Sequence, residues 1–98
     1  MQIHQILPVK VVVRDEKNAF TDDLQGGELE LQVLPPSNRI YHIPATKDFP
    51  NAVEGIFQVD FDPNEIGRHR LMLKYNDQDV QSKPIFITVE QTHFKHSE

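Results

Sequence analysis

The stretch that decides the fold is GIFQVDFDPNEIGRHRLMLKYNDQDVQSKPIFITV, residues 55–89. It contains three successive segments in which apolar and polar side chains alternate, each closed by turn residues. A period of two with one apolar face is typical of a half-buried β-strand, because successive side chains point to opposite faces. The apolar positions that we expect to share one core are Phe57, Val59 and Phe61, then Leu71, Leu73 and Tyr75, then Ile85, Ile87 and Val89.

Further strands are predicted upstream, where VKVVVR is rich in β-branched residues and GELELQVL alternates cleanly. Pro, Gly, Asn and Asp separate the segments, and no segment carries a 3.6-residue period between helix caps. This pattern predicts an all-β fold, an immunoglobulin-like antiparallel β-sandwich of about seven strands. The expected strands are 2–7, 9–14, 27–34, 39–43, 57–61, 70–75 and 85–89, in one domain over 1–90 that is followed by a polar tail or linker over 91–98.

Composition narrows the functional classes. The chain of 98 residues suffices for one domain with one core. It has no cysteine, which fits a reducing compartment and predicts a cytoplasmic location. The net charge of -5 disfavours nucleic acid as a partner, since phosphate binding needs a basic face. Arg68, Arg70 and Lys74 share one strand face, which we interpret as solvated. No apolar run is long enough to span a membrane, so we expect no membrane partner.

Candidate catalytic and metal-binding groups are scattered along the sequence. His93 and His96 have a metal-ligand spacing only if their segment is helical, and they lie in the polar tail. The aspartates occupy positions where turns ordinarily place Asp. His69 lies on an inward strand face, and we expect a structural role for it, with its ring hydrogen-bonded near the turn at Gly67. We therefore expect no enzymatic activity, no cofactor and no stabilisation by Ca²⁺ or Zn²⁺.

The order and punctuation of the last three strands resemble those of a filamin-type immunoglobulin repeat. GIFQVDFDP is similar to the family's G-T-Y-x-V-x-Y-x-P. NEIGRHRLMLKY is similar to its E-x-G-x-H-x-V-x-V-x-Y, with Gly67, His69 and Tyr75 in the matching positions. DQDVQSKPIFITV is similar to its G-x-x-V-x-G-S-P-F-x-V-x-V, although Ser82 and Lys83 replace the Gly-Ser. VKVVVRDEKNAF and LQVLPPSN resemble its second and third strands with their turns.

This resemblance implies a seven-stranded sandwich that serves as a spacer and interaction module. Such repeats occur in actin cross-linking proteins, as single copies in RING–B-box–coiled-coil (TRIM) proteins with NHL propellers, and in some HECT-type ubiquitin ligases. In the cross-linkers, partner peptides add a β-strand beside the third strand, in the groove that it forms with the fourth. The implied partners are therefore protein segments or neighbouring domains of the same chain.

The corresponding groove in this chain lies along 28–33, with 39–43 as its far wall. If 28–33 is an open edge, its unpaired N–H and C=O groups are available to a partner strand. In the alternative interpretation its outward glutamates protect the edge. The domain is then a rigid spacer within a ubiquitin ligase or an RNA-regulatory TRIM-NHL protein, and Met72 and Phe86 contact a neighbouring domain. The predicted partner-binding residues are Glu28, Glu30, Gln32, Ile40, Tyr41 and Ile43.

Overall fold

The computed structural model describes residues 1–80 and 83–91, whose regular elements are β-strands and isolated bridges joined by turns and loops. The all-β prediction is therefore confirmed. No helix capable of crossing a membrane occurs in these residues. The predicted tail, 91–98, lies outside them apart from Gln91. The strands are β1 (Leu7–Val12), β2 (Leu29–Leu34), β3 (Tyr41–Pro44), β4 (Ile56–Phe61), β5 (Gly67–Tyr75), β6 (Gln78–Asp79) and β7 (Ile85–Val89).

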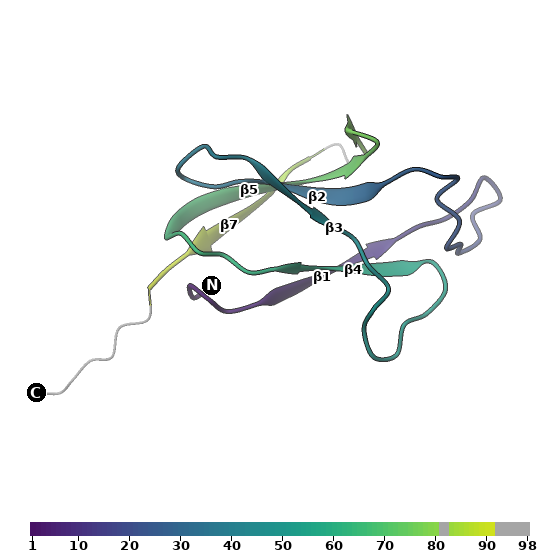
Figure 1. The fold of residues 1–98 in the computed structure, drawn as a ribbon, viewed down its shortest axis with the longest axis horizontal. Helices are drawn as coiled ribbons and strands as arrows, with labels where there is room; N and C mark the ends of the chain where they lie inside the picture. The colour runs from purple at the N-terminus through teal and green to yellow at the C-terminus, as the bar shows by residue number, and fades with distance from the viewer. Residues whose placement is uncertain (81–82, 92–98) are drawn as a thin grey trace, which may run out of the picture.

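The strands form two antiparallel sheets that lie as the two layers of a sandwich (Figure 1). β1 and β4 pair in the smaller sheet. The larger sheet has the order β3–β2–β5, and the far side of β5 pairs with both β7 and the short β6. After β3 the chain changes sheets. Thr46 and Gln58 of β4 exchange two backbone hydrogen bonds, with N···O distances of 2.9 and 2.8 Å. This crossing ties the two layers together beside β3.

The core lies between the sheets and is built from the inward positions of the alternating segments. Phe61 and Leu71 are fully buried, and Phe57 is 6% exposed. Leu73 and Ile87 are partly buried against this cluster. The shared core predicted from strand parity is therefore confirmed for these five residues. Because burial of one large apolar side chain contributes about 1.5–3 kcal/mol, this layer is the main source of stability.

Two strand assignments differ from the prediction. The strand expected over 2–7 is not formed, and Gln2 makes only an isolated parallel bridge to Glu90. The hairpin between β5 and β6 was not predicted. Its turn residues, Asn76 and Asp77, have φ angles of 50° and 66°. Two successive positive φ angles are typical of a type I′ hairpin turn, which Asn and Asp tolerate better than most residues.

The segment 28–33, which the sequence allowed to be an open edge, lies largely within β2 in the interior of the larger sheet. β2 pairs with β3 on one side and with β5 on the other. Between Leu29 and Val33 the backbone is therefore bonded on both sides, which leaves no open side for an added strand there in this fold. The outer strands of this sheet are β3 on one side, and β7 and the short β6 on the other. Ile85 of β7, predicted to be inward, is 42% exposed at that side.

Side-chain hydrogen bonds and an ion pair also hold the long connections at the end of the sandwich in place. The Asp22 carboxylate accepts a hydrogen bond from the Gly55 N–H at 2.6 Å and pairs with the Lys47 ammonium at 2.9 Å. The hydrogen bond from Gly55 is the main reason that the pKa of Asp22 lies below its ordinary value, and the interaction with Lys47 lowers it further. The Tyr75 hydroxyl donates to a carbonyl of the loop after β1. Its ring fills the space where a Cβ on Gly27 would lie, which explains the glycine there.

Candidate binding surface on strands β2 and β3

The face of the larger sheet that points away from the core carries most of the side chains predicted to contact a partner. Alternation along β2 directs the half-buried Glu30 and Gln32 outward. The register pairs Gln32 with His42 of β3, so His42 is also outward, and its Nε2 lies 3.3 Å from Gln32 Oε1. We call this surface the β2–β3 outer face, which comprises Glu28, Glu30, Gln32, Ile40 and His42.

Tyr41 and Ile43, which were also predicted to bind a partner, do not belong to this face. Their register partners on β2 are buried core residues, and both side chains pack half-buried against the core. Burial raises the pKa of the Tyr41 phenol, with further contributions from the carboxylates of Glu65 and Asp62. The Tyr41 side chain therefore lies on the core side of β3 and not on the β2–β3 outer face. Ile40, the alternative that the sequence allowed, is 51% exposed.

β3 has one side of its backbone without a strand partner among the described residues. The Ala45 N–H donates to the Leu29 carbonyl at 2.9 Å. Hydrogen-bonded pairs alternate along an antiparallel ladder, so the odd-numbered residues of β3 face β2, and His42 and Pro44 direct their backbone groups to the open side. Pro44 has no N–H, so the open side offers one donor and two carbonyl acceptors. Proline at such a place is a common protection of edge strands.

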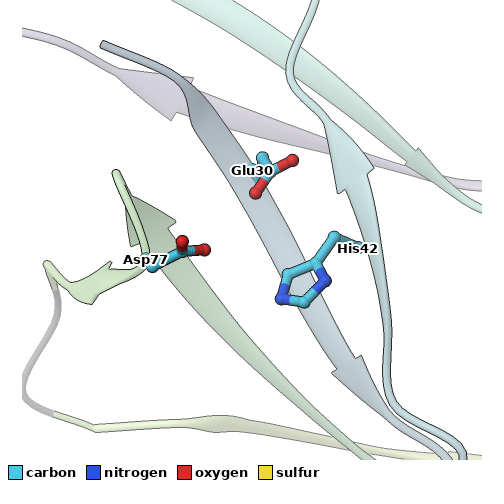
Figure 2. A group of neighbouring side chains, drawn as sticks. All are labelled: Glu30, His42 and Asp77. Carbon is cyan, nitrogen blue, oxygen red and sulfur yellow. The ribbon is translucent and has the colours of Figure 1, made fainter.

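Glu30, His42 and Asp77 bring three titratable side chains together on the outer face of this sheet (Figure 2). One potential ligand atom from each lies within 4.8 Å of the others. Asp77 reaches this position from the turn between β5 and β6. Asn76 holds that turn against β2, because its N–H donates to the Glu28 carbonyl and its Oδ1 accepts from the Glu28 N–H, both at 2.9 Å. Sequence reasoning missed this group because its members are far apart along the chain.

A second exposed surface, which we call the Arg68/Phe86 patch, lies at the other end of the same sheet face. The Arg68 guanidinium is 4.1 Å from the centroid of the Phe86 ring, and Phe86 is 51% exposed, as predicted. Arg70 lies beside Phe86 in the register of β5 and β7. An open groove of about 380 Å³ separates these side chains from Leu34 and Pro36 at the end of β2. An exposed aromatic beside a groove fits a contact with another protein surface.

His69 has the structural role that the sequence predicted. Its side chain is fully buried, and its Nδ1 lies 3.1 Å from the Gly67 carbonyl oxygen. The ring also packs edge-on against Phe61, with centroids 5.5 Å apart. These contacts fasten the start of β5 to the core. The remaining pair that the sequence singled out, His93 and His96, lies outside the described residues.

Comparison with known proteins identifies the fold. No protein-family model and no curated protein sequence matches this chain. Among solved structures, one described as the crystal structure of the Lin-41 filamin domain matches with a TM-score of 0.62 at 15% sequence identity. The match covers 92% of this chain and 81% of that one. The resemblance drawn from the sequence is thus confirmed at the level of the fold, and this chain has the architecture of a filamin-type immunoglobulin-like domain.

Proposed function

We propose that this domain is a non-catalytic protein-interaction module that takes up a partner segment as an added strand on the open side of β3. The observation that carries the proposal is the edge position of β3, where the backbone groups of His42 and the Pro44 carbonyl face away from β2. In strand addition, such main-chain groups supply general affinity and nearby side chains select the partner. The filamin-type fold is a non-enzymatic module type, which agrees with this function.

The side chains of the β2–β3 outer face would select which partner segment binds. Ile40 offers an exposed apolar contact beside the start of β3. Glu28 and Glu30 make the neighbouring surface acidic, so the preferred strand is apolar at alternate positions and neutral or basic between them. Tyr41 and Ile43 contribute indirectly, because their packing on the core holds β3 in place. The edge is only four residues long, so the interaction is expected to be weak and transient.

Titration of isotope-labelled chain with short synthetic peptides tests this function. One peptide alternates valine with lysine, and its matched control alternates valine with glutamate. We expect amide shifts centred on His42 and larger shifts with the lysine peptide. Reversing both glutamates, Glu28→Lys with Glu30→Lys, should invert the preference while leaving the melting temperature nearly unchanged. Shifts confined to the Arg68/Phe86 patch, with β3 silent, would reject strand addition.

The second candidate function is a rigid spacer within a ubiquitin ligase or an RNA-regulatory TRIM-NHL chain. The Arg68/Phe86 patch favours it, because an exposed aromatic beside a groove suits packing on a neighbouring domain of the same chain. The resemblance to repeats in TRIM proteins with NHL propellers supports this setting, and the cysteine-free sequence supports a cytoplasmic one.

The spacer function predicts that attachment of the neighbouring domain raises the melting temperature of this one. It also predicts that Phe86→Ala removes this increase while changing the isolated domain little. If the two domains melt independently of each other, with or without Phe86, the spacer function is rejected.

A further inference from the structure

We propose that Glu30, His42 and Asp77 form a binding site for a divalent transition-metal ion of the Zn²⁺ type. One imidazole nitrogen and two carboxylate oxygens are a donor set that Zn²⁺ accepts, with its fourth position taken by water. Ca²⁺ and Mg²⁺ prefer oxygen ligands throughout, so the imidazole discriminates between the two classes of ion. The site does not depend on strand addition at β3.

The geometry is close to what such an ion requires. The three ligand atoms lie within 4.8 Å of one another. Ligands bound about 2.0–2.2 Å from a tetrahedral ion are about 3.3–3.6 Å apart. Small side-chain rotations therefore complete the site, and the exposure of His42 and Asp77 permits them. Figure 2 shows that these two side chains approach from opposite sides of β2, the strand that carries Glu30.

The backbone that carries the three ligands is already held in place. Glu30 lies within β2, which is paired on both sides. His42 is fixed by the register of β3 against β2. Asp77 follows Asn76, whose two hydrogen bonds to Glu28 fix the turn to the residue that precedes β2. Binding therefore orders side chains only, which keeps its entropic cost low.

Electrostatics also favour a cation at this place. The carboxylates of Glu30 and Asp77 repel each other at this separation, and a divalent ion between them would reverse that interaction. The nearest basic residue in the register, Lys74 opposite Glu30, is paired with Asp79. Neither ligand carboxylate takes part in the ion pairs formed within the described residues. The proposal departs from the expectation from sequence that Zn²⁺ does not stabilise the fold, because that expectation treated the acids as scattered.

Calorimetric titration of the 98-residue chain with Zn²⁺ tests the site. We expect one Zn²⁺ per chain and a rise in melting temperature that EDTA reverses, because an ion that binds only the folded state stabilises it. Ca²⁺ should produce neither effect. His42→Ala should weaken the affinity by about tenfold or more, as even the loss of an outer-shell partner has effects of this size. Asp77→Asn should act similarly and retains a residue that tolerates positive φ.

Two controls separate this site from other histidines. His4→Ala removes an exposed imidazole elsewhere and should leave the affinity unchanged. The double variant His93→Ala with His96→Ala should also leave it unchanged. The absence of binding at millimolar Zn²⁺ would overturn the proposal. Binding that survives His42→Ala but is lost in the double variant would overturn it equally, since the ion would then belong to the C-terminal histidines.

Discussion

Replacing Phe57 with Ala removes a large side chain from the layer between the two sheets. Phe57 is 6% exposed and belongs to the buried cluster that contains Phe61 and Leu71. Truncation of a buried Phe costs about 3–5 kcal/mol, because transfer free energy is lost and a cavity remains. The Lys47 ammonium lies 5.0 Å from the centroid of the ring, and loss of that cation–π contact contributes about 0.5–1 kcal/mol of the total. For a small domain stable by about 5–15 kcal/mol, the loss is a large fraction.

Urea unfolding measures this loss, and an unchanged slope m shows that the variant still unfolds from a native-like state. The matched control is Phe86→Ala, the same chemical change at a residue that is 51% exposed. Its expected cost is about 0.5–1 kcal/mol, from the contact with Arg68. A loss below about 1 kcal/mol at Phe57, or equal losses at the two sites, would show that the inward face assigned to β4 is wrong.

Three further changes probe the loops and the open edge. The Gly55 N–H lowers the pKa of Asp22 in the folded protein relative to the unfolded chain. The ionised carboxylate therefore stabilises the fold at a pH above its unfolded pKa, and this stabilisation is lost as the pH falls through the lower pKa of the folded state. In Asp22→Asn the melting temperature should depend less on pH below about pH 4 than in the wild type. The same pH dependence in both proteins would contradict this. Gly27→Ala should cost about 1–3 kcal/mol, because its Cβ meets the Tyr75 ring; a wild-type melting temperature would show that the ring moves aside. Pro44→Thr restores an N–H on the open side of β3 and should promote pairing of two chains through this edge. Analytical sedimentation should then detect dimers, and a monomer at every concentration would count against an open edge.

Strand parity could be predicted from the sequence because it depends on a local repeat. The alternation in 55–89 identifies β4, β5 and β7, and the burial of Phe61 and Leu71 follows from it. The role of His69 was predictable for the same reason, since its ring bonds to Gly67 only two residues away. Asn18 also adopts the left-handed conformation, with φ of 66°, which asparagine tolerates better than most residues.

The identity of a strand's neighbours could not be predicted in this way. Alternation distinguishes the two faces of a strand, but a central strand and an edge strand show the same alternation. The sequence therefore left open whether 28–33 is an edge, whereas β2 is paired on both sides. Pro44 is the residue that marks the true edge. Its missing N–H is tolerated where no ladder partner requires one, and this signal is readable in the sequence.

The grouping of Glu30, His42 and Asp77 depends on the same missing information at longer range. Asn76 and Asp77 between two alternating segments are a recognisable hairpin signal. That signal places Asp77 at the end of β5 but does not say that β5 lies beside β2. Only the strand order β3–β2–β5 brings a residue of each neighbour over Glu30. Weaker Zn²⁺ binding in both His42→Ala and Asp77→Asn would therefore support this strand order as well as the donor chemistry of the site.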